Sequence, residues 1–257
     1  MYSLITSGMT WSYSRISSFN SCPYKFFLTY IVPCAKIPQF FSGYGSFMHE
    51  LLADFYRGHK TKDEIFREYL TEFRTHVAGK APDHKIFSNY FQQGLSHLKE
   101  LVYPEQKILG VENHVSFQVG NHPFIGYIDL LLRDEETGDI TVCDHKSRAL
   151  KPRSTRGKYT KTDEELDHYL RQLYLYSIPV EQTYGILPTA LTFNCYRTGT
   201  VIREPFSASA FQEAKDWASS SIEQIIHAKD FSPKMDYYFC KYICDVHDSC
   251  EYYAMQN

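Results

Sequence analysis

The sequence has 257 residues, of which 43% are hydrophobic and 22% are charged, and its formal net charge is −3. This composition excludes a disordered, collagenous or low-complexity protein and supplies enough apolar material for one compact domain or two small ones. The charge balance argues against a protein that coats nucleic acid by bulk attraction, although a local basic stripe can still bind phosphates. No uncharged apolar run reaches the roughly 18 residues of a membrane span, and Met1 to Trp11 lacks the features of a signal peptide. We therefore expect a cytoplasmic protein with no membrane partner.

Helices dominate the first hundred residues. The segment Ser12 to Ile31 predicts two short helices that break at Pro23, with Ser or Thr near each start as caps. Apolar residues at helical spacing predict three further helices, over Tyr44 to Tyr56, about Lys62 to Val77 and about His84 to Tyr103.

Strands follow this helical part. Three β-rich runs separated by turn residues predict a three-stranded meander. A polar segment then leads into a helix, a pair of strands and a last helix, and this order predicts one α/β domain with a central mixed sheet. Its parts are a mainly helical region over 1–105, an α/β core over 106–230 and a cysteine-rich tail over 231–257. The expected elements of the core are strands over Ile108 to Val119, Pro123 to Arg133, Ile140 to Ser147, Ala190 to Arg197 and Thr200 to Glu204, and helices over about Asp163 to Ile178 and Ser207 to Lys229.

The seven cysteines are expected to be free thiols, because an odd number in a chain without a secretory signal gives no reason for a disulfide framework. Three of them, Cys240, Cys244 and Cys250, crowd the end of the chain with a spacing that lets several thiolates meet at one metal centre. Three ligands are one fewer than a closed site needs, so a fourth must come from elsewhere. The other thiols are Cys22 and Cys34 near the start, and Cys143 and Cys195 in apolar runs typical of buried packing.

Two carboxylates interrupt apolar strands, where packing alone does not place them. Asp129 stands inside one run and Asp144 ends another, and a buried charge is costly unless it is paired or bound to a metal. Strand alternation puts Asp144 and Lys146 on one face and His145 on the other. Such acids can hold a divalent cation while the lysine stabilises charge on a phosphoryl transition state. The alternative is a strand-end ion pair with no functional role.

Further candidate residues lie elsewhere in the chain. His49 is placed on a helix and is available as a metal ligand, although a lone histidine is more often a surface or core residue. Gln172 and Tyr176 lie four apart on one helix face, where both can hydrogen-bond a phosphate or a base. The polar segment contains six basic residues with no acid between them, which fits either a phosphate-binding stripe or a solvated loop. These residues are Arg148, Lys151, Arg153, Arg156, Lys158 and Lys161.

As a set, these residues resemble the PD-(D/E)XK nuclease superfamily, specifically its RecB-like branch, which includes the nuclease domains of bacterial end-processing helicase–nucleases and the CRISPR-associated adaptation nucleases. The resemblance covers nearly the whole chain and implies a restriction-endonuclease-like core. Each matching string is short, but five occur in the right order. They are Ser14 to Ser17 with Cys22 to Phe26, Gly45 to Glu50, Gly126 to Asp129, Asp144 to Lys146, and Gln172 to Tyr176.

The resemblance implies that His49, Asp129 and Asp144 bind a catalytic Mg²⁺ or Mn²⁺ ion, with the carbonyl of His145 as an extra ligand. The imidazole favours activity with Mn²⁺ at least equal to that with Mg²⁺. Glu112 resembles a recurrent strand glutamate with a supporting role near the metal ligands.

The remaining implied roles concern catalysis and substrate binding. Lys146 takes the place of the catalytic lysine, and Gln172 and Tyr176 take the place of residues that position the substrate strand. The basic stripe, with Arg148, Lys151, Arg153 and Arg156, is expected to contact DNA.

An iron–sulfur cluster of the four-iron type is also implied, because many members of the branch hold one between an N-terminal cysteine and three C-terminal ones. Cys22, Cys240, Cys244 and Cys250 take those places here. The chain has Cys-x3-Cys-x5-Cys where the family usually has Cys-x2-Cys-x5-Cys, and Cys34 offers a competing thiol. Zinc or reduced thiols are the alternatives. A cluster would hold the two ends of the chain together as a structural staple.

The function predicted from these residues and this resemblance is a metal-dependent deoxyribonuclease, with exonuclease action on DNA ends or single strands. The alternatives are a catalytically silent nucleic-acid-binding or scaffolding subunit and an RNA-directed nuclease. No Gly-x4-Gly-Lys-Ser/Thr loop occurs in the sequence, so a helicase or recombination partner would be a separate polypeptide. The compact format suits a phage or mobile-element product.

Overall fold

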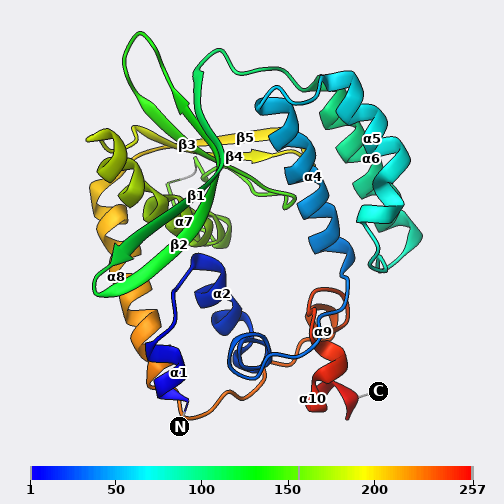
Figure 1. Ribbon diagram of the computed structural model, residues 1–257, viewed down its shortest axis with the longest axis vertical. Coiled ribbons are helices and arrows are strands. Elements are labelled where there is room, and N and C mark those ends of the chain that lie inside the picture. Colours follow the sequence, from blue (N-terminus) through cyan, green and yellow to red (C-terminus); the bar gives the residue numbers. More distant parts are fainter. Residues whose placement is uncertain (1, 156, 256–257) are drawn as a thin grey trace.

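A computed structural model describes residues 2–155 and 157–255 (Figure 1). Its centre is a five-stranded sheet in the order β1-β2-β3-β4-β5. The pairing of β3 with β4 is parallel and the other pairings are antiparallel, which confirms the predicted α/β class with a mixed central sheet. Strand ends differ from the prediction by at most two residues. The strands are β1 (Lys107–Val119), β2 (His122–Arg133), β3 (Ile140–His145), β4 (Ala190–Cys195) and β5 (Thr200–Pro205).

The N-terminal region begins with short helices. The predicted break at Pro23 is confirmed, and Cys22 lies in an extended conformation between the two helices it separates. The side chain of Ser12 caps the first of them by accepting a hydrogen bond from the Arg15 amide. A further short helix at the start of the chain was not predicted. The elements are α1 (Ser3–Ser7), α2 (Tyr13–Ser21), α3 (Pro23–Phe26) and a π-helical turn η1 (Phe27–Ile31).

Three longer helices follow: α4 (Phe40–Tyr56), α5 (Lys62–His76) and α6 (His84–Glu100). The first begins four residues earlier than predicted, because Phe40 is fully buried among the aromatic side chains of this region. A capping box at Thr61 begins α5, and the Asp83 side chain caps α6.

Helix α7 (Lys161–Tyr184) continues past Pro179, where the sequence predicts an end at Ile178. Proline removes one backbone hydrogen bond, but Pro179 and Val180 are buried and their packing keeps the chain helical. The helix ends at Gly185, which adopts the left-handed conformation with φ of 73°. Helix α8 (Ala208–Ile226) packs against α7.

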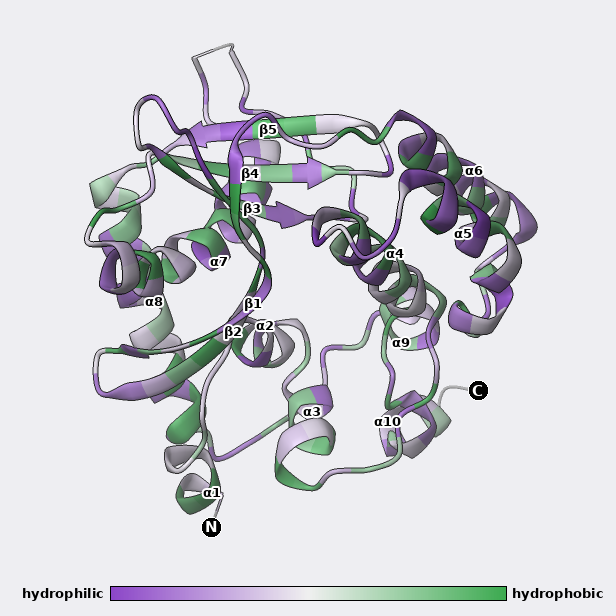
Figure 2. Ribbon diagram, turned by 45° about the horizontal axis from the view of Figure 1, so that its top comes forward, coloured by the Kyte–Doolittle hydropathy of each residue, from purple (hydrophilic) through white to green (hydrophobic). Residues whose placement is uncertain are grey.

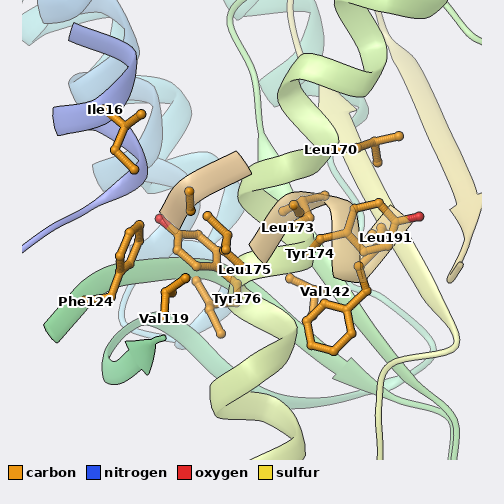
Figure 3. Close-up of a cluster of buried hydrophobic side chains, with 14 of the residues drawn as sticks. Ile16, Val119, Phe124, Val142, Leu170, Leu173, Tyr174, Leu175, Tyr176 and Leu191 are labelled. Carbon is orange, nitrogen blue, oxygen red and sulfur yellow. The ribbon is translucent and has the colours of Figure 1, made fainter. Parts of the chain in front are cut away.

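The sheet separates two hydrophobic clusters. Helices α2, α7 and α8 cover one face and pack on strand residues such as Phe124, Val142 and Leu191 (Figure 3). Helix α4 covers the other face, with α5 and α6 outside it. Figure 2 shows hydrophilic residues concentrated on α5 and α6 and hydrophobic residues along the middle of β4. The carboxyl end of β3 and the neighbouring middle part of β2 therefore lie between α4 on one side and α7 on the other.

The tail contains α9 (Tyr237–Tyr242), a 3-10 turn η2 (His247–Ser249) and α10 (Glu251–Ala254). It lies against the start of the chain. Asp245 forms ion pairs with Lys25 at 2.9 Å and with Lys36 at 3.2 Å, and its carbonyl accepts a hydrogen bond from the Ile37 amide at 2.8 Å. Gln39 donates to the Cys244 carbonyl at 3.2 Å. Within residues 2–155 and 157–255, the structure has no helix with the length and apolar character of a membrane span.

Candidate active site

His49, Glu112 and Asp129 bring their potential ligand atoms to within 4.8 Å of one another. His49 comes from α4, Glu112 from β1 and Asp129 from the adjacent β2. The Nδ1 atom of His49 lies 3.1 Å from Glu112 Oε1 and 3.6 Å from Asp129 Oδ2. On its other side, His49 Nε2 is 3.0 Å from the carbonyl oxygen of His145. Imidazole, carboxylate and carbonyl groups thus converge at one end of the sheet.

The backbone at Glu112 is strained. Its φ is +51°, and it is the only non-glycine residue in the described part of the chain with positive φ. Neighbouring pairs Val111↔Leu130 and Asn113↔Ile128 place Glu112 opposite Asp129 in the β1–β2 ladder. A left-handed conformation costs a residue with a Cβ atom about 1–2 kcal/mol, and such strain is concentrated at functional sites. Sequence reasoning gave Glu112 only a supporting role, because no local pattern shows that its side chain turns toward His49.

Asp144 lies outside this three-residue group and pairs instead with Lys146. The Lys146 Nζ atom is 2.7 Å from Asp144 Oδ2 and donates to Gln172 Oε1 at 3.0 Å. Gln172 Nε2 in turn donates to the Tyr176 hydroxyl at 3.3 Å. The structure therefore joins four of the predicted site residues into one chain of contacts from β3 to α7.

Gly126 explains how Tyr176 reaches the sheet. A Cβ atom at this position of β2 would lie 2.3 Å from Tyr176 Cε1, so only glycine allows the ring to pack there. The glycine stands three residues before Asp129, within one of the matching sequence strings.

The His49–Glu112–Asp129 group and the contacts of Asp144 with Lys146 meet at the peptide bond between Asp144 and His145. Asp129 Oδ2 accepts a hydrogen bond from the His145 amide at 2.6 Å, which holds the Asp129 carboxylate beside the end of β3. Asp129 and Asp144 are 7% and 3% exposed. Two buried carboxylates on neighbouring strands, a histidine and a lysine thus bring together groups that could hold a divalent cation and a positive charge beside it.

A family model described as the PD-(D/E)XK nuclease superfamily matches residues 10–251. The chain belongs to this superfamily. The match confirms the superfamily predicted from the sequence and covers both groups of site residues. No curated protein matches the chain.

Electrostatic interactions in the candidate site favour positive charge near the carboxylates. Burial opposes protonation of His49, but the hydrogen bond to Glu112 and the charges of Asp129 and Asp144 outweigh it and raise the pKa of His49 to about 9. Both ring nitrogens face acceptors, which fits the protonated imidazole. Burial and the charge of Asp144 raise the pKa of Asp129. Burial disfavours the charged form of Lys146 as well, yet the Asp144 carboxylate outweighs it and raises the lysine's pKa, so Lys146 is an ammonium ion at neutral pH.

The His145 side chain points away from Lys146, as strand alternation predicts. Its ring stacks on Tyr56 at a centroid distance of 5.7 Å, and its Nδ1 atom lies 3.2 Å from Asn194 Nδ2. Burial and the charge of His49 lower the pKa of His145 well below its usual value, so the ring is neutral. The His145 ring also lies edge-to-face with His49 at a centroid distance of 5.9 Å, and the backbone carbonyl of His145 is the atom that could serve as a metal ligand.

The two described arginines of the predicted basic stripe, Arg148 and Arg153, are paired with acids. Arg148 forms an ion pair with Glu165 at 2.7 Å, and Arg153 contacts both Asp167 and Glu204. These acids come from α7 and β5, which the sequence of the stripe could not show. Lys151 is exposed, whereas Arg156 lies outside the described residues.

Five cysteines gather where the two ends of the chain meet, namely Cys22, Cys34, Cys240, Cys244 and Cys250. All seven lie in the described part and are free. Burial raises the pKa of Cys244 to about 11, with the nearby Cys22 thiol as a further cause, and burial together with the Cys22 and Cys240 thiols raises the pKa of Cys250. Cys34 also packs beside Cys244 and Cys250.

The four predicted cluster ligands, Cys22, Cys240, Cys244 and Cys250, do not form a compact site for a single metal ion. In the described part of the chain, no three of their sulfur atoms lie within 4.8 Å of one another. Sulfurs around one zinc ion, at Zn–S distances of about 2.3 Å, would be roughly 3.8 Å apart. A multi-iron cluster holds its sulfurs farther apart, and four thiolates match its donor chemistry.

Proposed function

We propose that the protein is a metal-dependent DNA nuclease of the RecB-like branch that hydrolyses phosphodiester bonds at DNA ends or in single strands. The observation that carries this proposal is the meeting of His49 and Asp129 with the Asp144–Lys146 pair at one end of the sheet. A structural ion pair alone does not explain why a half-buried lysine, two buried acids and a strained glutamate share this region.

The donor set suits Mg²⁺ or Mn²⁺. Carboxylate and carbonyl oxygens are the preferred ligands of both ions, and an imidazole favours Mn²⁺. His49, Asp129 and Asp144, with the His145 carbonyl, would hold the ion, and Glu112 lies within reach of the same position. When bound, such an ion makes a phosphoryl group more electrophilic and water more acidic.

Lys146 supplies a fixed positive charge. The Asp144 carboxylate raises the pKa of Lys146, and the resulting ammonium group can stabilise charge that develops on the scissile phosphate. Gln172 accepts a hydrogen bond from the ammonium group and Tyr176 holds Gln172, so α7 orients the lysine. The lysine also lies 5.4 Å above the Tyr169 ring, which limits its movement further.

We also propose that Cys22, Cys240, Cys244 and Cys250 hold an iron–sulfur cluster that ties the tail to the N-terminal helices. The proposal is supported by the four-thiolate donor set and by contacts between these segments that do not involve the cysteines, including the Lys25–Asp245 ion pair. Cys34 is the alternative N-terminal ligand.

The test of the nuclease proposal is digestion of single- and double-stranded DNA labelled at either end, with Mn²⁺ or Mg²⁺. We expect wild-type protein to cleave and Lys146→Ala and Asp129→Asn to lose at least about 100-fold in rate, because each removes a charge that acts in the transition state. Lys107→Ala is the matched control, since Lys107 is an exposed lysine paired only with the exposed Glu135. Calorimetric titration with Mn²⁺ gives a readout independent of cleavage, and Asp129→Asn should weaken binding.

Cleavage that survives both substitutions would contradict the assignment of the site. DNA binding by wild-type protein without cleavage in either metal would favour the silent-subunit alternative. Faster cleavage of labelled RNA than of DNA would redirect the proposal to RNA.

A further inference from the structure

Two hollows flank the candidate active site, and their charges differ. One, of about 660 Å³, is lined by four acids, namely Glu50, Asp54, Glu68 and Glu112, and by His49, Arg57 and Lys60. The other, of about 570 Å³, lies beside Lys146. Its lining, within the part of the chain that the structure describes, contains Lys146, two arginines and no acid. The hollow beside Lys146, with cations and no acid in its lining, is therefore the more favourable of the two for a phosphate-bearing ligand.

The hollow beside Lys146, which we call the aromatic hollow, has rings on several walls. Phe41 comes from the start of α4, Tyr90 from α6, Tyr169 from α7 and Tyr238 from α9. Tyr238 is 43% exposed, so a face of its ring is accessible to a ligand. Aromatic faces of this kind stack on unpaired bases and do so for every base.

Arg197, which follows β4, is the second feature of the aromatic hollow. Its guanidinium carbon lies 3.9 Å from the centre of the Tyr90 ring, so the side chain is held flat against α6. Its Nε atom is enclosed and has no hydrogen-bond partner among the described residues, while the side chain also lines the hollow. The planar guanidinium group binds phosphate oxygens with bidentate geometry, so Arg197 is the residue of this lining best suited to a phosphate. Arg148, the other arginine of the lining, is already paired with Glu165.

We propose that the aromatic hollow is a subsite for one unpaired nucleotide next to the scissile phosphate, with the base stacked on Tyr238 and the phosphate bound by Arg197. The inference rests on the proposed nuclease function and assigns residues that the superfamily match does not. The volume lies within the 300–1,000 Å³ of ordinary ligand pockets and suits a nucleotide rather than a duplex. Base faces are accessible only when the strand is unpaired.

The subsite also gives the cysteine-bearing tail a role in substrate binding. Tyr238 and Ile243 line the hollow, and Cys240 lies between them in the chain. The Tyr238 ring packs against Phe41 at a centroid distance of 6.3 Å. Docking of the tail on the start of α4 therefore completes one wall of the subsite.

The test is fluorescence anisotropy with labelled oligothymidylate in EDTA, so that binding is measured without catalysis. We expect Tyr238→Ala to weaken binding about 5- to 150-fold, the range for loss of one stacked base. Tyr238→Phe should bind like wild type because it keeps the ring. Tyr237→Ala is the matched control, since Tyr237 precedes Tyr238 in α9, is 62% exposed and does not line the hollow.

Arg197→Ala is tested through the dependence of affinity on salt. Loss of one phosphate contact should reduce the slope of log affinity against log salt concentration by about 0.7 for a single strand. Arg74→Ala is the control, since Arg74 also lies over an α6 ring, that of Phe87, but outside the hollow. Thermal unfolding of each variant shows that it is folded.

The subsite is refuted if Tyr238→Phe binds as weakly as Tyr238→Ala, if Tyr237→Ala loses as much affinity, or if Arg197→Ala leaves the salt slope unchanged. Tighter binding of a blunt duplex, or of oligouridylate, than of oligothymidylate would also refute it. Failure of the nuclease proposal is distinguishable, because it appears as absent cleavage with Mn²⁺ and not as a change in binding in EDTA.

Discussion

The strain at Glu112 predicts that two substitutions which both remove its carboxylate differ in stability. Glu112→Ala keeps a Cβ atom at φ of +51°, whereas Glu112→Gly relieves the conflict. The left-handed conformation costs a residue with a Cβ atom about 1–2 kcal/mol, and the greater freedom of glycine in the unfolded chain offsets about 0.5–1 kcal/mol of the gain. We therefore expect Glu112→Gly to be more stable than Glu112→Ala by about 0.5–1 kcal/mol.

Urea unfolding monitored by tryptophan fluorescence measures this difference, since Trp11 is fully buried in the core beneath the sheet. Mn²⁺ titration of the same proteins should show equal losses for Glu112→Gly and Glu112→Ala, because both lack the carboxylate near His49. Glu112→Gln is a further reference that retains the size of the side chain. An alanine variant as stable as the glycine variant would refute the argument from backbone strain.

Three other predictions follow from packing, burial and thiol chemistry. Gly126→Ala forces a methyl group into the Tyr176 ring. It should lower the free energy of unfolding in urea by about 1–3 kcal/mol and should also reduce the rate of cleavage. Gly45→Ala on α4 places its methyl group in open space and should raise the free energy of unfolding by about 0.5–1 kcal/mol. Burial lowers the pKa of His97 to about 4, below the usual 6.5. Between these two pH values the unfolded chain therefore binds more protons than the folded protein does. The contribution of neutral His97 to stability is lost as the pH falls from 6.5 toward 4. Unfolding of wild type and His97→Gln should therefore show a stability difference that shrinks by about 2 kcal/mol between pH 7.5 and pH 5. Protein purified without oxygen should be brown, and Cys244→Ser should lose the visible absorption and unfold at a lower temperature.

Controls separate these effects from general destabilisation. His227→Gln makes the same chemical change at a histidine whose side chain is 77% exposed, so it controls for the substitution without burial. Cys195→Ser changes a buried cysteine of β4 and should keep the visible absorption. A His97→Gln difference independent of pH would contradict the burial argument, and colourless wild-type protein with bound zinc would contradict the cluster.

Local sequence features determined much of the architecture. Helical and two-residue periodicities, together with capping residues such as Thr61, predicted the main helices and strands, because these patterns depend on neighbours only a few residues away. Alternation along one strand likewise determined that Asp144 and Lys146 share a face while His145 turns from it. The short strings and their order were sufficient to predict the superfamily.

The tertiary structure decided which of these groups meet. Glu112 is 63 residues from its partner His49, and its approach depends on a left-handed backbone and on the packing of α4 against β1. The acids that pair with Arg153 come from α7 and β5, and the continuation of α7 past Pro179 depends on burial against its neighbours. Periodicity records which side of an element is buried but not what lies across from it, and contacts between distant segments arise only when the layers pack.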